Sequence, residues 1–300
     1  MIDAQNTRPA KTSLWKEGFR LFGRHQQGWA KLGLVFFVVM AVIDFLTPRL
    51  VPGQEIESAV KSHQSLPPGV VETMILVYGV MLVVAVVQGY LFNAFFLARE
   101  PVAGSARIGG DGFLSYLRTY ICLILIGVAY ALALAVLLAV GGGVALVAVK
   151  LAHIAVPKPA IAVVNAVLIA VAAAGMIYLV VMLMPAVALA ANRIEHPIRN
   201  AWRLVRGNWW RVFGNMLLMM LLLMLAFLVL LVGAGLLVLV VSLVTKQPLL
   251  ALFHMSWPVI QGAAQVIMGG LMVAFTCALS RILYEEKRRA DPHFVLTTRG

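Results

Sequence analysis

This chain has few charged residues. They make up only 12% of its 300 residues, whereas hydrophobic residues make up 62% and the mean hydropathy is +0.95. Soluble domains carry about 25% charged residues, so a soluble fold is excluded. Several apolar runs exceed the roughly 18 residues that mark a membrane-spanning helix. Because the backbone in lipid must satisfy its own polar groups, and the runs do not alternate as barrel strands do, the sequence predicts an all-α polytopic membrane protein.

The sequence also lacks the patterns that support catalysis or metal binding. Its two cysteines, Cys122 and Cys277, give neither a disulfide framework nor a metal-ligand spacing, and we interpret them as free core thiols. No H-E-x-x-H, G-x-S-x-G or P-loop motif occurs. Glu195 and His196 are interpreted as the polar start of a loop. We therefore expect a protein that is not an enzyme and that has no catalytic residues, no metal site and no cofactor.

Six segments are predicted to cross the membrane as helices. The third to fifth are longer than a core of about 30 Å requires at ~1.5 Å per residue, so we expect them to tilt, kink or project. Pro185 and the glycines at 141–143 are expected points of bending. The polar, basic stretch before the first span predicts a retained signal anchor. The spans are 32–51, 73–98, 119–148, 160–190, 214–244 and 258–283.

Lysine and arginine are distributed unevenly between the two sides of this topology. Of the 24 in the chain, five lie on one side (Arg49, Lys61, Lys150, Lys158 and Lys246) and the other nineteen lie on the side of both termini. The positive-inside rule therefore predicts that both termini are cytoplasmic. The net charge of +12 follows from this topology and from attraction to anionic headgroups, so it requires no nucleic-acid partner.

Two basic and aromatic segments align without gaps: WKEGFRLFGR (15–24) and IRNAWRLVRG (198–207). In each, apolar residues recur at steps of four and three, and basic residues follow one place later. This pattern predicts an amphipathic helix in the cytoplasmic interface, with its aromatic side in the acyl boundary and its basic side among headgroups. Gly207 would end the second helix and Asn208 would cap the next. The predicted headgroup and interface residues are Trp15, Lys16, Phe19, Arg20, Arg24, Arg199, Trp202, Arg203, Arg206, Trp209, Trp210 and Arg211.

A second similarity favours an internal repeat. GYLFNAFFLA (89–98) matches GGLMVAFTCA (269–278) at an offset of 180, close to the offset of 183 between the basic segments. Chance similarity of apolar strings is the alternative. A diverged middle copy would begin with DGFLSYLRTY (111–120). We predict one membrane domain over 1–300, built from three parallel two-helix repeats at 13–100, 111–193 and 196–284, with a cytoplasmic tail at 285–300.

Small residues recur at every fourth position in three of the predicted spans. The rows are Gly127 to Gly143, Ala162 to Ala174 and Gly270 to Ala278. Such rows let helix backbones approach closely, so they predict helix packing, and an alanine-rich composition is the alternative explanation.

Polar side chains are rare within the predicted spans. Asp44 is interpreted either as a proton or cation relay or as a carboxylate paired with Arg49 or Lys61 near the outer interface. Interhelical hydrogen bonds, worth about 0.6–2 kcal/mol each, explain the uncharged polar groups. The alternative is a small-solute transporter or channel. Its polar cavity would be lined by Asp44, Gln88, Asn93, Gln261 and Gln265.

The run PAVALAANRIEHPIRNAWRLVRGNWWRVFGNMLL (185–218) resembles the hallmark of a bacterial membrane domain. That domain is found fused to some glycerophosphodiester phosphodiesterases and in related stand-alone inner-membrane proteins. SRILYEEKRR (280–289) and FRLFGR (19–24) resemble its closing and opening segments. The resemblance implies a six-helix fold in the bacterial inner membrane, and it implies no catalytic residues because no polar segment is long enough for the phosphodiesterase domain. The family pattern is filled by Glu195, Ala201, Trp202, Arg203, Arg206, Gly207, Trp210 and Arg211.

Together these patterns predict a non-enzymatic protein of the bacterial inner membrane. It would bind or organise lipids or other amphiphiles, or scaffold a lipid-modifying partner, at the inner leaflet. The expected partners are membrane lipids, anionic ones above all, with a second copy of the chain or a lipid-metabolism protein as further candidates and no nucleic acid.

Overall fold

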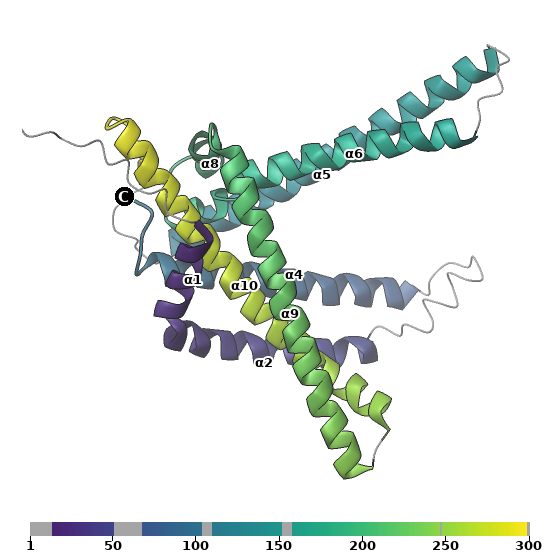
Figure 1. Cartoon of the computed structure of the whole chain (residues 1–300), viewed down its shortest axis with the longest axis vertical. Coiled ribbons are helices and arrows are strands. Elements are labelled where there is room, and N and C mark those ends of the chain that lie inside the picture. The colour runs from purple at the N-terminus through teal and green to yellow at the C-terminus, as the bar shows by residue number, and fades with distance from the viewer. Residues whose placement is uncertain (1–13, 51–67, 104–109, 152–157, 247, 299–300) are drawn as a thin grey trace, which may run out of the picture.

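The chain forms long helices joined by short connections (Figure 1). The computed structural model describes residues 14–50, 68–103, 110–151, 158–246 and 248–298, and over these residues it is helical apart from connections and one isolated bridge. All six predicted spans are confirmed as helices long and apolar enough to cross a membrane, so this is a multi-pass membrane protein. They are α2 (Gln26–Leu50), α4 (Pro68–Leu97), α5 (Gly110–Leu151), α6 (Lys158–Leu183), α9 (Trp209–Thr245) and α10 (Leu249–Ala290).

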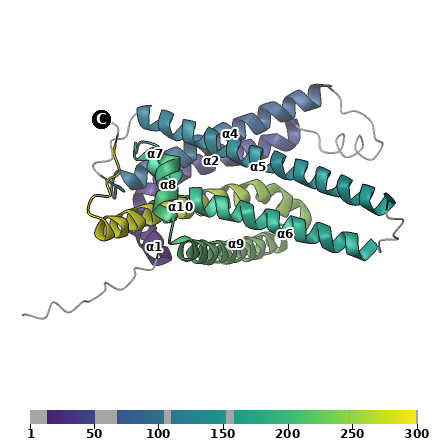
Figure 2. The same cartoon turned by 90° about the horizontal axis from the view of Figure 1, so that it is seen from above.

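Three short helices gather at one end of the long ones: α1 (Leu14–Arg24), α7 (Ala186–Ala191) and α8 (Pro197–Val205). From this end three hairpins, α2–α4, α5–α6 and α9–α10, fan out in different directions in Figure 1, and Figure 2 shows α4 and α9 on opposite sides of the molecule. We call this end the basic end and define it as residues 14–28, 94–103, 110–122, 184–216 and 274–298. The parts of the hairpins that lead away from it are called the far halves. That the hairpins arose as sequence repeats stays a prediction.

Helix α10 lies at the centre of the molecule. In its spanning window 61% of the residues are buried, against 6% in those of α5 and α9. Helices α1, α2, α4, α7, α8 and α9 all contact it. Helix α1 approaches it closely at Gly18, where an added Cβ would lie 3.1 Å from Cα of Phe275. A larger side chain at position 18 would therefore push the two helices apart.

Only one of the three rows of small residues packs as predicted. In α10, Gly270, Ala274 and Ala278 are all buried. In the other two rows the prediction is wrong, because the described members that follow Gly127 and Ala162 are exposed. The reason is a large side chain between α5 and α6: Tyr130 donates a hydrogen bond of 2.6 Å to the carbonyl of Ala172 and packs on Gly175. The exposed row members are Ala131, Ala135, Ala139, Ala166, Ala170 and Ala174.

The larger hydrophobic core lies at the basic end and extends into the adjoining turns of the spans, with the short helices between them, and a smaller cluster joins α2, α4 and α10. The fully buried side chains of the larger core come from every part of the sequence, which ties the three hairpins together. They include Leu21, Phe96, Leu97, Met182, Leu189, Ile194, Leu204, Met219, Phe275 and Leu279.

The predicted helix breaks are partly confirmed. Helix α6 ends at Leu183 and α7 begins after Pro185, whose ring removes a backbone donor. Gly207 has a φ of +89°, a conformation that glycine adopts readily, and it separates α8 from α9. Asn208 is the N-cap residue before α9, as predicted, but its side chain makes no capping hydrogen bond.

Two segments differ from the sequence prediction. Residues 111–120 are not a separate interfacial helix, because α5 is one continuous helix from Gly110 and also runs through 141–143. The segment expected to be a tail begins inside α10 and then turns back on the molecule. The N–H of Glu195 donates to the carbonyl of Thr297 at 2.9 Å, and Leu296 is buried.

Candidate functional site

Helix α1 turns a different face to the protein from the one that its aromatic residues suggest. The residues buried on it are Leu14, Gly18 and Leu21. Trp15 is only partly buried at the edge of this core, and Phe19 is 37% exposed. The buried stripe is thus shifted by one residue from the predicted aromatic stripe. Lys16 and Arg20 remain on the exposed side of the helix.

Helix α8 is built in the same way. Ala201, Leu204 and Val205 are buried in the core, and the amide of Asn200 donates to the carbonyl of Glu195 at 2.6 Å. The arginines at 199, 203 and 206 are exposed. The predicted aromatic residues of this region differ in their exposure. Trp202 and Trp209 pack against Tyr178 at ring distances of 5.9 and 5.6 Å, whereas Trp210 is 77% exposed.

A cluster of ion pairs holds α1, α4 and α10 together. Arg281 of α10 donates to Glu17 of α1 at 2.5 Å, and its other terminal nitrogen pairs with Glu100, which follows α4. All three side chains are between 12% and 16% exposed. Arg20 also pairs with Glu17, and Arg24 donates to Glu100 at 3.0 Å. Two predicted headgroup residues, Arg20 and Arg24, therefore have carboxylate partners within the protein.

A second ion pair joins α9 to α10. Nη1 of Arg211 donates to both carboxylate oxygens of Glu286, at 2.8 and 2.6 Å. A third pair, between Arg193 and Asp111 at 2.5 Å, joins the segment after α7 to the start of α5. These pairs lie on elements far apart in sequence, so they fix how the hairpins meet at the basic end.

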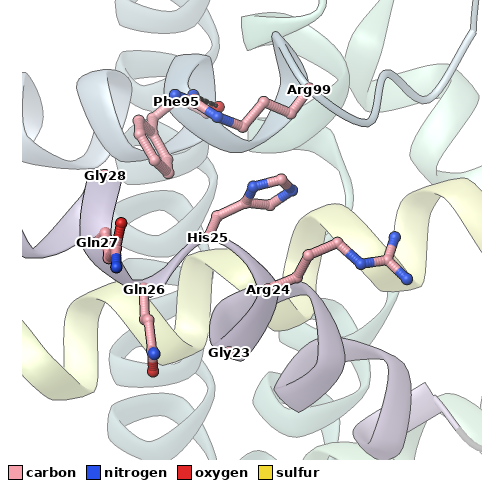
Figure 3. A pocket seen from close by; sticks show the side chains of 8 residues that line it. All are labelled: Gly23, Arg24, His25, Gln26, Gln27, Gly28, Phe95 and Arg99. Atoms are coloured by element: carbon pink, nitrogen blue, oxygen red, sulfur yellow. Dashed lines mark hydrogen bonds between the residues drawn. The ribbon is translucent and has the colours of Figure 1, made fainter.

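An open pocket of about 440 Å³ lies where α1 turns into α2 (Figure 3). Arg24 and Arg99 approach it from opposite sides, with His25 between them. The guanidinium of Arg99 stacks over the ring of Phe95 at 3.7 Å. Burial, and then the positive charges of Arg99 and Arg24, lower the pKa of His25 below its usual 6.5. Its Nε2 lies 3.7 Å from Glu100 without a hydrogen bond.

A second open pocket, of about 380 Å³, lies between the start of α5 and the start of α8. It contains two cations, Arg118 and Arg199. Across the ranges that the structure describes, neither arginine forms an ion pair with a carboxylate. Its other lining residues are Ser115, Thr119, Cys122, His196, Pro197 and Ile198.

A third pocket, of about 290 Å³, lies further along α5 and is lined almost entirely by apolar side chains. Four helices border it: α5, α6, α7 and α10. Thr276 is its one hydroxyl residue, and its hydroxyl already donates to the carbonyl of Val273 at 2.9 Å. The remaining lining residues are Leu123, Ile126, Gly127, Met176, Leu179, Val180, Leu183, Met184, Val187 and Met272.

The five residues of the predicted polar cavity line none of these three pockets. Asn93 is buried, and its amide donates to the carbonyl of Gly89 within its own helix while its oxygen faces the thiol of Cys277 at 3.4 Å. Gln88 is buried against Gly269, and Gln265 is exposed. Asp44 and Gln261 are partly buried. The transporter alternative stays a prediction.

Several residues of the basic end were missed by sequence reasoning. Glu17 and Glu100 were not singled out, and Arg118 was counted only for topology. The sequence does mark the two glutamates, because each is an acidic residue whose charged neighbours in sequence are basic. Arg118 lies between Ser115 and Cys122 at steps of three and four, which places it beside the polar stripe of α5.

Comparison of this chain with protein-family models, with characterised proteins and with solved structures found no match. The resemblance to the phosphodiesterase-associated membrane domain therefore rests on the sequence motifs alone. Among the described residues there is also no group of three or more histidine, cysteine or acidic side chains that would hold a metal ion.

Proposed function

We propose that this protein is a multi-pass protein of the bacterial inner membrane that binds anionic phospholipids at its basic end, on the cytoplasmic side. It works on or with lipids as a binding or organising protein, and it supplies no catalysis of its own. The observation that carries this proposal is the difference between the paired and the unpaired cations of the basic end.

Three partly buried carboxylates of the basic end are already neutralised by arginines. Glu17 and Glu100 pair with Arg281, and Glu286 pairs with Arg211. Exposed arginines of the same end, among them Arg118, Arg199 and Arg206, have no carboxylate partner among the described residues. A basic residue near a membrane surface gains about 1 kcal/mol from anionic headgroups, so these arginines favour an anionic surface.

The position of these cations relative to the spans also supports a lipid ligand. They lie at the basic end, from which the apolar and largely exposed far halves of the spans lead away, and phospholipid headgroups meet their chains at such a boundary. Trp210, 77% exposed beside Arg211, is the kind of residue that lies at the level of headgroups. The uneven distribution of lysine and arginine favours the cytoplasmic side for this end.

The test places the full chain in nanodiscs that contain phosphatidylglycerol and phosphatidylcholine in equal amounts, and it measures the proportion of each lipid that the protein retains. We expect the lipids around wild-type protein to be enriched in phosphatidylglycerol. Replacing Arg203 and Arg206 with Gln reduces this enrichment, because both side chains are exposed at the basic end. Lys246→Gln is the control, since it removes an exposed charge from the other end of α9.

Two results would contradict the proposal. One is a wild-type protein that shows no preference for phosphatidylglycerol. The other is an equal loss of preference in the Lys246 variant and in the Arg203 and Arg206 variants, because that would show a general effect of net charge and no role of the basic end.

A further inference from the structure

We infer that the second and third pockets form one site for a single anionic phospholipid. Its phosphate lies between Arg118 and Arg199, and one acyl chain lies in the apolar pocket bordered by α5, α6, α7 and α10. This inference rests on the proposed function and gives it a place in the fold.

The two pockets border the same stripe of α5. Ser115, Thr119 and Cys122 line the polar pocket and Ile126 lines the apolar one. The steps between them are four, three and four residues, which keeps all four side chains on one face of a helix. Thr119 and Ile126 are seven positions apart on this face, a rise of about 10 Å. A chain that leaves the polar pocket along the helix axis would therefore reach the apolar one, in the order in which a phospholipid headgroup is followed by its chain.

The polar pocket complements a phosphate. Arg118 comes from α5 and Arg199 from α8, so the two guanidinium groups approach from separate elements. Helix α8 begins at this pocket with His196 and Pro197, and its first backbone N–H groups have no partner within the helix. The positive end of the α8 dipole adds to the two charges.

The apolar pocket complements a chain. Its volume of about 290 Å³ is close to the lower end of the range for ligand pockets, about 300 Å³. Three methionines, Met176, Met184 and Met272, contribute to its wall, and methionine adapts to a flexible apolar ligand. Gly127 opens the wall on the side of α5, because an added Cβ there would meet nothing within 4 Å.

The chain end of the site is tested by filling it. Gly127 lines the pocket, an added Cβ there would meet nothing within 4 Å, and leucine suits a helix better than glycine does, so we expect Gly127→Leu to fold. Gly79→Leu is the matched control, since that glycine also has open space around it but lies on α4. Native mass spectrometry of the full chain with added phosphatidylglycerol should show one retained lipid in wild type and in Gly79→Leu. In Gly127→Leu the affinity of the protein for this phosphatidylglycerol should fall at least tenfold.

The headgroup end of the site is tested by removing its two positive charges. Arg118→Gln combined with Arg199→Gln should weaken the retained phosphatidylglycerol by about tenfold or more. Arg203→Gln combined with Arg206→Gln removes the same charge outside the pocket and should leave this one lipid in place. Glycerol phosphate, which offers the headgroup without a chain, should not compete at concentrations at which phosphatidylglycerol binds. Phosphatidylcholine should be retained less than phosphatidylglycerol.

The outcomes separate this site from the general function. If Gly127→Leu retains the lipid as wild type does, or if glycerol phosphate competes equally, the two-pocket site is wrong even where the nanodiscs show a preference for anionic lipid. If wild type shows no preference in the nanodiscs, the proposed function fails. Equal losses in the two pairs of arginine variants also overturn the site, because they assign the binding to the whole basic surface.

Discussion

The two ends of the hairpins are built differently. At the basic end three short helices, a continuous core and ion pairs between distant elements fix the contacts of every helix. In the far halves large apolar side chains such as Val136, Leu243 and Val244 are exposed. The α5–α6 hairpin also separates from the α2–α4 hairpin as both lead away from the basic end (Figure 1).

This difference follows from the solvent that each region would meet. Apolar side chains in hydrocarbon gain little by leaving lipid for a protein core, so the far halves of α5, α6 and α9 stay largely exposed, whereas α2 still packs on α10 through Phe36 and Val266. At the basic end, by contrast, charged and polar groups lie near water, and burial of apolar surface again stabilises the fold. Interactions that specify this protein are therefore concentrated at the basic end, and so are its open polar pockets.

The largest difference should appear when one leucine is truncated in each region. Leu279 is fully buried in α10, whereas Leu243 in α9 is 72% exposed. Leu279→Ala should destabilise the protein by about 3 kcal/mol because it leaves a cavity in the core. Leu243→Ala should cost less than about 0.5 kcal/mol. Thermal unfolding of both variants in detergent measures the difference, and equal shifts of the melting temperature would contradict it.

Removal of the central cation should have the next largest effect. In Arg281→Met the carboxylates of Glu17 and Glu100 lose their closest common partner while they remain mostly buried. We expect a loss of about 3 kcal/mol, reduced by the arginines of α1 that still face them. Arg288→Met, an exposed position seven residues further along α10, serves as the control. Equal melting temperatures of the two variants would contradict this prediction.

A smaller loss should follow from separating α1 from α10. Gly18→Leu places a side chain against the backbone of Phe275, where an added Cβ already lies at 3.1 Å, and should cost about 2 kcal/mol. Gly23→Leu lies on the same helix with nothing within 4 Å of an added Cβ. Limited proteolysis after α1 should be faster in the Gly18 variant alone. Equal cleavage of both variants would show that α1 does not depend on this contact.

The smallest expected effect is a dependence on pH at the pocket of Figure 3. Burial and the neighbouring Arg99 and Arg24 lower the pKa of His25, so the folded state favours the neutral ring. Below pH 6.5 the unfolded chain takes up a proton that the folded chain does not. The contribution of His25 is therefore present above pH 6.5 and is lost as the pH falls toward the lower pKa of the folded state. The melting temperature of wild type should fall more between about pH 7 and pH 5 than that of His25→Gln, and parallel curves would contradict this.

The spans were predictable because each rests on a local property. A long apolar run in lipid has to be a helix, and all six runs are helices in the structure. Their ends were less accurate: α5 begins at Gly110, before the predicted 119, because residues 111–120 continue the helix without a break. The turn at Gly207 was also predictable, since glycine readily adopts its positive φ.

The contacts of the basic end were not predictable in the same way. Amphipathic periodicity predicted that the aromatic stripe of α1 lies in the acyl boundary, but it did not indicate that Leu14, Gly18 and Leu21 pack against the protein, with Gly18 close to the backbone of Phe275. The pairing of Glu17 and Glu100 with Arg281 joins residues more than 180 positions apart, and no local pattern records it. Both pockets along α5 also depend on how separate hairpins meet.

The central claim is that the basic end is where this protein binds anionic lipid. The most direct measurement uses a phosphatidylglycerol with a photoreactive headgroup, added to the full chain in nanodiscs, followed by mapping of the labelled peptides by mass spectrometry. The account predicts labelling within 115–122 and 196–211 that exceeds the labelling near Lys246, and a weaker contrast with a photoreactive phosphatidylcholine. Equal labelling of the two ends, or equal contrast with both lipids, would contradict it.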